Sequence, residues 1–311
     1  MSEKYDVAII GGGPAGLTAG LYTSRAGIKS LLIEKGVPGG LMAATYWIEN
    51  YPGFDEGISG LDLSKKMEKQ ARRFGLDLRT GSIDDIRING KEKVLISDNG
   101  TEISTKAVII ATGSDPKKLN VEGEERLRGK GVSYCATCDG AFFRDKKVAV
   151  IGGGNSALQE AIFLTRFAEE IFIVHRRDKL RATRINQEKA FSESKIKFIW
   201  DSVVEKIEGN ETLSSIRLKN LRSKESENLR VDGIFIYIGS SPNTEFLRGL
   251  VKLDYYRFII TDEKMATSVP GIYAAGDVRA NDLKQIVTAA GDGAIAALSA
   301  ERYIEENFRQ D

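Results

Sequence analysis

The chain has 311 residues, a length that suits two domains of ordinary size. Its 45 Lys and Arg residues nearly balance its 44 Asp and Glu residues, so we expect no general attraction to nucleic acid. No apolar run reaches the roughly 18 residues that a membrane span requires, and the N-terminus carries no signal-peptide pattern. We therefore expect a cytoplasmic protein that binds neither nucleic acid nor membranes.

The first predicted elements form a strand–turn–helix unit. The pattern predicts a strand over 5–10, a helix over 17–26 and a second strand over 30–33. Between the first strand and the helix, Gly11, Gly13 and Gly16 match the Gly-x-Gly-x-x-Gly dinucleotide fingerprint in its proper context. Glu34 follows at the end of the second strand. A carboxylate there can accept hydrogen bonds from ribose hydroxyls and would repel a 2′-phosphate. This unit is predicted to hold FAD or NAD; a glycine-rich turn without a ligand is the alternative.

A later strand over 107–110 continues this unit and ends in the small-residue turn Ala111-Thr112-Gly113. Asp115-Pro116 then interrupts the pattern.

Cys135 and Cys138 are the only cysteines of the chain. A Cys-x-x-Cys pair commonly has a lowered thiol pKa and a redox role. A zinc site is disfavoured because His175 is the only histidine available to complete it. A static disulfide would close too short a loop to stabilise much, and a reducing cytosol would oppose it. Asp139 follows directly and can exchange a proton with a thiolate, although an Asp there is often a turn residue.

A second glycine-rich turn starts at Gly152. We predict a strand over 147–151, a helix over 156–167 and a strand over 171–174. The third small position of the fingerprint is an alanine, which the pattern allows. Here bases replace the acid of the first unit: Arg176, Arg177 and Arg181 follow the second strand. Guanidinium groups pair well with phosphate, so this unit is predicted to prefer NADPH over NADH. A solvated basic loop is the alternative, and His175 either lines the phosphate pocket or is a loop residue.

The two fingerprints lie 141 residues apart, which is an internal repeat at the scale of a domain. A strand over 234–238 closes the second unit, and Ser241-Pro242 follows as a second break. The tail adds a short strand that ends in Gly276-Asp277 and a small-residue helix over 286–304. We predict an α/β fold with two Rossmann-like nucleotide-binding domains, in which a domain of residues 117–245 is inserted into one formed by 1–116 and 246–311.

Almost end to end, the chain resembles the low-molecular-weight thioredoxin reductases. The resemblance rests on the motifs Gly11 to Tyr22, Glu49-Asn50-Tyr51-Pro52-Gly53, Ala111-Thr112-Gly113, Cys135-Ala136-Thr137-Cys138-Asp139-Gly140, His175-Arg176-Arg177 with Arg181, Ala275-Gly276-Asp277 and Ala300-Glu301-Arg302-Tyr303. The Cys-x-x-Cys-Asp motif inside the second nucleotide domain is highly specific to that family.

The resemblance implies an NADPH-dependent flavoenzyme that reduces the disulfide of thioredoxin. Its FAD contacts would be Gly11, Gly13, Pro14, Ala15, Gly16, Glu34, Lys35, Gly40, Leu41, Asn50, Ile83, Ala111, Thr112, Gly113, Gly276, Asp277, Lys284, Gln285 and Ile286. Its NADPH contacts would be Gly154, Asn155, Ser156, His175, Arg176, Arg177, Arg181, Ile238 and Gly239. The resemblance also implies that Cys138 faces the flavin, Cys135 attacks the partner disulfide and Asp139 is the general acid. It further implies a homodimer whose inserted domain rotates.

Two positions depart from the family pattern. Leu41 stands where the family usually has Gln, and Lys284 stands where Arg usually precedes Gln285. Other functions stay open on the sequence alone: an NADPH flavin oxidase, an electron donor to a peroxide-reducing dithiol partner, or a nucleotide-binding redox sensor. The predicted second coenzyme site argues against the sensor, because a sensor needs no source of hydride.

Overall fold

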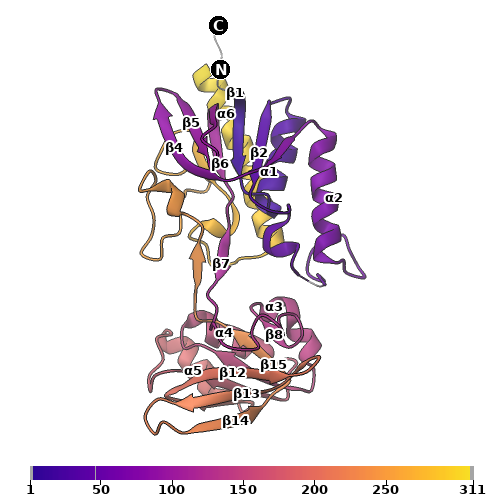
Figure 1. The fold of residues 1–311 in the computed structure, drawn as a ribbon, viewed down its shortest axis with the longest axis vertical. Coiled ribbons are helices and arrows are strands. Elements are labelled where there is room, and N and C mark those ends of the chain that lie inside the picture. The colour runs from indigo at the N-terminus through magenta and orange to yellow at the C-terminus, as the bar shows by residue number, and fades with distance from the viewer. Residues whose placement is uncertain (1–2, 46, 309–311) are drawn as a thin grey trace. The chain divides into compact units, whose positions relative to one another are not determined.

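The computed structural model describes residues 3–45 and 47–308 and divides into two compact units (Figure 1). Unit 1 combines Met1–Asp115 with Ser241–Asp311, and unit 2 is Pro116–Ser240. The connecting segments contain β7 (Ser114–Pro116) and β16 (Ser240–Pro242), which pair with each other. The boundaries expected from the sequence, 116/117 and 245/246, lie within five residues of those in the structure.

Unit 1 is built on one large sheet. Its strands are β1 (Glu3–Ile10), β2 (Ser30–Glu34), β3 (Asp77–Thr80), β4 (Ile83–Asn89), β5 (Glu92–Ser97), β6 (Glu102–Ile110) and β17 (Ile272–Ala274). In the part of unit 1 that the structure describes, the strand order is β3-β2-β1-β6-β5-β4, and β17 also pairs with β6. Strands β1, β2, β3, β6 and β17 pair in parallel, whereas β4 and β5 pair in antiparallel fashion. The neighbours β1 and β6 mark the topological switch point, where ligands bind in open α/β sheets.

Helices cover this sheet. They are α1 (Pro14–Arg25), α2 (Gly60–Arg73) and α6 (Ile286–Phe308). The short 3₁₀ helices η1 (Gly40–Met42), η3 (Glu245–Leu247) and η4 (Gly276–Val278) lie in the connections between the elements of unit 1. Helix α1 begins three residues earlier than the pattern predicts, because Pro14 fits the first helical position. Helix α6 continues past the predicted end at 304.

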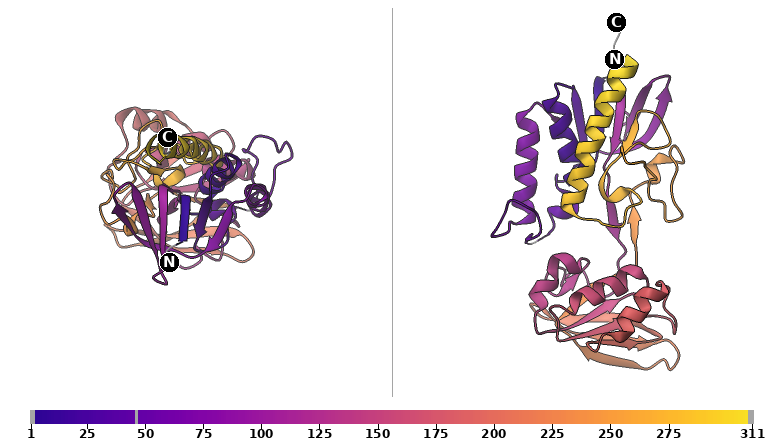
Figure 2. Two further views of the ribbon diagram at one scale, coloured as in Figure 1. Left: turned by 90° about the horizontal axis from the view of Figure 1, so that it is seen from above. Right: turned by 180° about the vertical axis from the view of Figure 1, so that it is seen from behind.

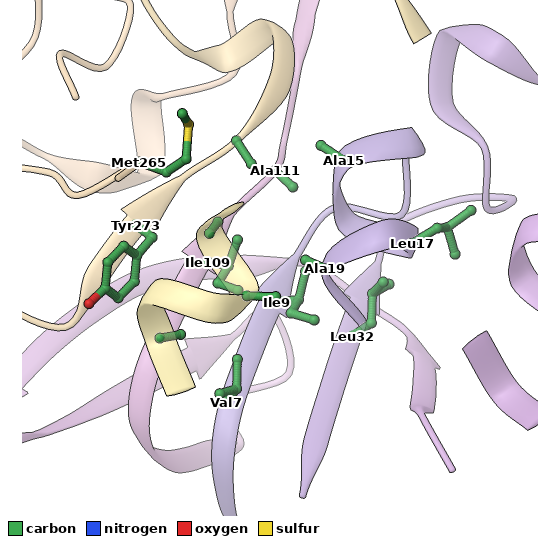
Figure 3. Close-up of a cluster of buried hydrophobic side chains, with 14 of the residues drawn as sticks. Val7, Ile9, Ala15, Leu17, Ala19, Leu32, Ile109, Ala111, Met265 and Tyr273 are labelled. Atoms are coloured by element: carbon green, nitrogen blue, oxygen red, sulfur yellow. The ribbon is translucent and has the colours of Figure 1, made fainter. Parts of the chain in front are cut away.

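One face of the sheet and α1 enclose an apolar core (Figure 3). Val7, Ile9 and Ile109 come from the central strands, and Leu17 and Ala19 come from α1; all are at most 1 % exposed. The end of β1 is buried without a break, as expected for a central strand covered on both faces. This packing holds the turn after β1 rigidly at the carboxyl edge of the sheet.

Helix α6 lies against α1, as the rear view shows (Figure 2). Its buried positions are small: Ala289, Gly293, Ala296, Ala297 and Ala300. A side chain at Gly293 would overlap the carbonyl oxygen of Ala15, so glycine permits the close approach of the two helices. The small-residue pattern of this helix therefore serves helix packing.

Unit 2 is a second α/β unit of the Rossmann type, so the predicted fold class is confirmed for both units. All its residues, 116–240, are described, and they form a five-stranded parallel sheet in the order β11-β10-β9-β15-β8 and a three-stranded antiparallel sheet, β12-β13-β14. The parallel strands are β8 (Val132–Ser133), β9 (Lys147–Ile151), β10 (Glu170–Val174), β11 (Ile196–Ile199) and β15 (Gly233–Ile236). The antiparallel strands are β12 (Ser202–Gly209), β13 (Leu213–Asn220) and β14 (Ser226–Arg230). The helices are α3 (Ala136–Asp139), α4 (Asn155–Leu164) and α5 (Arg184–Ser192), with the turn η2 (Gly140–Phe143).

Within residues 3–45 and 47–308, no helix combines the length and apolar character needed to cross a membrane.

Lys93 in β5 is a buried lysine, with 1 % of its surface exposed. Its Nζ donates hydrogen bonds to the carbonyl oxygens of Lys91 and Lys106 at 2.9 and 3.0 Å and to the Tyr303 hydroxyl at 3.0 Å. Among the described residues, no carboxylate forms an ion pair with it. Burial lowers the pKa of Lys93 to about 8.

Because the pKa of Lys93 is lowered in the folded protein, we expect the free energy of unfolding to depend on pH. Between about pH 8 and pH 10.5 the unfolded chain binds more protons than the folded chain at this position, so stability rises with pH by up to about 3 kcal/mol. Lys93→Met is expected to remove that rise, whereas Lys91→Met, at an exposed neighbour, keeps it. Urea unfolding at a series of pH values measures the effect. An unchanged pH slope in Lys93→Met would contradict the prediction.

Candidate active site and nucleotide sites

The first glycine-rich turn lies between β1 and α1. Gly11 has φ +104°, and a side chain there would overlap the carbonyl of Ala111 at the end of β6. A side chain at Gly16 would overlap the Gly11 carbonyl. At Gly13, by contrast, no described residue other than its two chain neighbours comes within 4 Å of the position that a Cβ would take. The first and third glycines are thus needed for packing, and the second leaves the open approach that a pyrophosphate requires.

Glu34 binds the turn itself. Its carboxylate accepts hydrogen bonds from the Gly12 N–H at 2.6 Å and from the Gly36 N–H at 2.9 Å. The sequence analysis expected Glu34 to bind a ribose only. The structure shows that it also binds the backbone of the turn. A carboxylate has about four lone-pair positions, so acceptor capacity remains for ribose hydroxyls.

The C-terminal segment returns to the same turn. Gly276 in η4 lies against Ala15 of α1, with room for no side chain, and its N–H donates to Asp292 Oδ2 at 3.0 Å. Asp277 follows, and burial raises the pKa of its carboxyl while Lys284 opposes this. These contacts bring together two predicted FAD segments that lie some 260 residues apart in the sequence.

Lys284 is held by the same segment. Its Nζ donates to the Asp277 carbonyl oxygen at 2.7 Å and to Asn281 Oδ1 at 3.2 Å, and it lies 4.1 Å from the centre of the Phe258 ring. Burial lowers the pKa of Lys284. The lysine that replaces the family's usual arginine at this position is therefore held by hydrogen bonds and an aromatic ring within unit 1.

Asn50 and Gln285 meet although 235 residues separate them: Asn50 Nδ2 donates to Gln285 Oε1 at 3.0 Å. Asn50 belongs to residues 49–55, which line an open depression of about 540 Å³. The structure thus joins a loop and the start of α6, which the predicted FAD contacts had grouped only by resemblance.

The other predicted FAD residues occupy varied positions. Lys35 follows β2, Gly40 and Leu41 lie in η1, and Ile286 begins α6. The Ile83 side chain is buried in the apolar core beneath β4. Thr112 and Gly113 form hydrogen bonds with Asn243, a residue that the sequence analysis did not assign to the site. Thr112 Oγ1 donates to the Asn243 carbonyl oxygen at 2.8 Å, and the Asn243 N–H donates to the Gly113 carbonyl oxygen at 3.1 Å.

The dithiol pair lies at α3 in unit 2. Cys135 and Cys138 form a disulfide with their Cα atoms 5.3 Å apart, and both residues are partly exposed. The Asp139 N–H donates to the Cys135 carbonyl oxygen at 3.1 Å, which closes one helical turn. The pair is therefore held in a compact turn that solvent or a partner can reach.

Asp139 has one strong hydrogen bond, which it accepts from Ser133 Oγ at 2.6 Å. Ser133 Oγ also accepts the Cys135 N–H at 3.0 Å, so one serine joins the acid to the first cysteine. Burial raises the pKa of the Asp139 carboxyl, and the bond from Ser133 opposes that shift. A carboxyl of raised pKa beside a dithiol suits proton exchange with a thiolate.

The second glycine-rich turn repeats the first within unit 2. Gly152 packs against the Tyr237 carbonyl, and Gly153 packs against the His175 ring. At Gly154, no described residue other than its chain neighbours comes within 4 Å of the position that a Cβ would take. His175 is 5 % exposed, and its Nε2 lies 3.1 Å from the Lys179 carbonyl oxygen. Burial lowers the pKa of His175. Its side chain supports the turn from beneath, and an NADPH contact for it stays a prediction.

The predicted phosphate-binding bases are exposed. Arg176, Arg177 and Arg181 all lie on the surface, and no carboxylate among the described residues forms an ion pair with them. The Arg181 N–H donates to the Gly153 carbonyl oxygen at 2.7 Å, which brings this loop to the second turn. Asn155 Oδ1 accepts the Thr183 N–H at 2.7 Å and holds the loop to the start of α4. Free guanidinium groups beside a glycine-rich turn are suited to bind a phosphate.

The remaining predicted coenzyme residues frame the same edge. Ser156 is exposed in the first turn of α4, and Ile238 and Gly239 follow β15. The Gly239 carbonyl oxygen accepts the Lys117 N–H at 2.9 Å.

Two glycine-rich dinucleotide turns and a disulfide-forming pair define a nucleotide-dependent oxidoreductase that acts on disulfides. The chain belongs to the pyridine nucleotide-disulphide oxidoreductase family, whose model matches residues 5–293. It is 50 % identical over 303 residues to a thioredoxin reductase of Listeria innocua, covering 97 % of this chain and 94 % of that protein. It is 49 % identical over 309 residues to one of Bacillus subtilis, covering 98 % and 97 %. A crystal structure of thioredoxin reductase from Streptococcus pyogenes matches with a TM-score of 0.93 and 46 % identity, covering 98 % of this chain and 100 % of that one.

Proposed function

We propose that this enzyme is a thioredoxin-disulfide reductase that uses NADPH and FAD. The observation that carries the proposal is the Cys135–Cys138 disulfide, which lies along the sequence between two glycine-rich dinucleotide turns, in a chain about half identical to thioredoxin reductases. The reaction consumes NADPH, a proton and an oxidised thioredoxin, and it yields NADP⁺ and the thioredoxin dithiol.

The two cofactors divide between the units. FAD binds unit 1 at the turn of Gly11 to Gly16, where Glu34 and Asp277 supply acceptors for hydroxyl groups. NADPH binds unit 2, where Arg176, Arg177 and Arg181 are free to pair with its 2′-phosphate. When bound, these groups supply a hydride and a carrier that passes an electron pair to the Cys135–Cys138 disulfide.

The side chains of the chain perform the disulfide exchange. In the reduced enzyme, the Cys135 thiolate attacks the partner disulfide, forms a mixed disulfide and releases one partner thiolate. Cys138 then attacks the Cys135 sulfur, restores the Cys135–Cys138 disulfide and releases the second partner thiolate. Asp139 accepts a proton from one cysteine thiol and delivers it to a leaving thiolate, for which its raised pKa is suited.

A steady-state assay tests this function. NADPH oxidation by the purified holoenzyme is followed with oxidised thioredoxin, with oxygen alone and with a peroxide-reducing dithiol protein. Turnover that depends on thioredoxin supports the proposal. Turnover with oxygen alone would favour a flavin oxidase, and turnover with the peroxide-reducing protein alone would favour the other alternative.

The purified protein is expected to be yellow and to release one FAD per chain on denaturation. Gly16→Val should lose the flavin, because its side chain would overlap the Gly11 carbonyl. Gly291→Val is the matched control, since apart from the neighbouring backbone of α6 no described residue comes within 4 Å of its Cβ position. Absorbance spectra and quantification of the released flavin measure the result. A wild-type protein without flavin bands would contradict the cofactor assignment.

We further propose a cytoplasmic homodimer. Helix α6 exposes an apolar stripe, Val287, Ile295 and Leu298, each more than 40 % exposed and on one helical face. Such a stripe suits a second copy of the chain. A cytoplasmic location suits a dithiol that is reduced by NADPH in every cycle.

Ile295→Glu with Leu298→Glu is expected to give a monomer, because two charges would be buried in the dimer interface. Leu61→Glu is the control, at a similarly exposed apolar position on α2. Sedimentation of the holoproteins measures the mass. A monomeric wild type, or a dimer that survives both substitutions, would rule out this interface.

A further inference from the structure

The backbone of the dithiol turn is held by two side-chain oxygens. The Cys135 N–H donates to Ser133 Oγ at 3.0 Å, and the Ala136 N–H donates to the Tyr237 hydroxyl at 2.6 Å. Cys135 is the N-cap residue of α3 and Ala136 is its first residue, so no carbonyl of the same helix can accept either N–H. Of these two contacts, the Tyr237 contact is the long-range one, since 101 residues separate its partners.

Tyr237 is itself firmly placed. It follows β15, and its backbone N–H donates to the Ile151 carbonyl oxygen at 2.8 Å at the end of β9. Its ring packs against the apolar cluster that contains Ala136, Leu158 and Ala161. The hydroxyl therefore connects the central strands of unit 2 to the peptide group between the two cysteines.

Tyr237 carries a neutral hydroxyl. Burial raises the pKa of Tyr237, and the nearby carboxyl of Glu160 raises it further. Among the described residues, Glu160 Oε2 is buried without a hydrogen-bond partner, and burial raises the pKa of this carboxyl as well. The phenol oxygen thus remains a neutral acceptor for the Ala136 N–H across the working pH range.

We propose that Tyr237 is a positioning residue for the Cys135/Cys138 pair: its hydroxyl holds the backbone between the two cysteines in the geometry that the disulfide needs. The inference rests on the proposed function, since the pair must cycle for this to matter. In the reduced state the tether keeps the thiols close to ring-closing geometry. Closure then costs less backbone entropy, and the disulfide is favoured over the dithiol.

Tyr237→Phe tests this directly, because it removes one oxygen and keeps the ring. Fixing one residue's backbone is worth about tenfold in an equilibrium constant. The variant's dithiol–disulfide equilibrium should therefore move about tenfold toward the dithiol, which is about 30 mV more positive in reduction potential. The matched control is Tyr134→Phe. Tyr134 directly precedes Cys135 but lies outside the disulfide ring, and the substitution removes its partly buried hydrogen bond to Glu124 Oε1 at 2.7 Å.

The holoenzymes are equilibrated in graded glutathione buffers, and alkylated thiols are counted by intact mass. A shift in Tyr237→Phe with none in Tyr134→Phe supports the proposal. No shift in Tyr237→Phe, or the same shift in both variants, overturns it. The measurement uses no thioredoxin, so failure of the proposed function, seen as no turnover by the wild type, is distinguished from failure of this inference.

A second measurement needs no variant and applies if Tyr237→Phe does not fold. Hydrogen exchange of the Ala136 amide is followed by NMR in wild-type holoenzyme with isotope-labelled alanine, in the oxidised and in the reduced state. Protection in both states supports the tether. Rapid exchange in the reduced state overturns the proposal, because the hydroxyl would then not hold the open dithiol.

Discussion

Cys135→Ser and Cys138→Ser are each expected to abolish reduction of the partner disulfide, by at least about a thousandfold. One remaining thiol cannot complete the exchange, since the mixed disulfide has no second sulfur to resolve it. NADPH should still bleach the flavin in both variants, because transfer of hydride requires neither sulfur. Thr137→Ser is the control: it keeps both cysteines and a hydroxyl at 137, whose oxygen lies 3.4 Å from Cys135 Sγ.

The two variants also assign the sulfurs. Cys138→Ser retains the proposed attacking thiol and should trap thioredoxin as a stable mixed disulfide, whereas Cys135→Ser should not. Non-reducing electrophoresis and mass spectrometry detect the adduct. The opposite pattern would reverse the two roles, and substantial turnover by either single variant would remove the pair from the reaction.

Arg176→Ala is expected to lower kcat/KM for NADPH by about tenfold to a hundredfold and to leave kcat/KM for NADH nearly unchanged. A hydrogen bond to a charged group contributes about 1.5–3 kcal/mol, and only NADPH carries the 2′-phosphate that would accept it. The control is Arg184→Ala in α5, whose guanidinium is 92 % exposed and pairs with Glu188 at 2.7 Å. Steady-state kinetics with both coenzymes measure the effect.

The wild type should itself prefer NADPH. Equal kcat/KM values for the two coenzymes would be evidence that the basic loop is a solvated surface. A loss in Arg176→Ala that is the same for NADPH and NADH would point to a general effect on unit 2.

Much of the fold was predictable because its signals are local. A turn that needs a positive φ at Gly11 selects glycine in the sequence, and the flanking strand and helix have their own periodicity. The same reasoning located the second turn at Gly152. The strands β12, β13 and β14 were not predicted. The pairing of β12 with β13 contains two register shifts, which interrupt the alternation of buried and exposed positions that would have indicated strands.

The candidate site was predictable in its motifs and less so in its contacts. Cysteine spacing indicated the redox pair, and three arginines after the second strand of the second fingerprint indicated the basic loop. Ser133, Tyr237 and Asn243 were missed as partners of the site residues, because an isolated Ser, Tyr or Asn has no periodic or spacing signal. Each makes a hydrogen bond with backbone or side chain that only the folded chain brings within reach.

The two glycine-rich turns, the Cys-x-x-Cys pair, and the acid and bases at matching strand ends were recognisable from the amino-acid sequence alone, because these features depend on residues that are neighbours along the chain. What those residues contact became visible only in the folded chain. Gly16 is needed because a carbonyl lies against it, and Gly276 because the C-terminal segment returns to Ala15. Glu34 bonds to the turn it was expected only to accompany. Such contacts join residues far apart in the sequence, and they form only when the apolar core fixes the strands and helices that carry them.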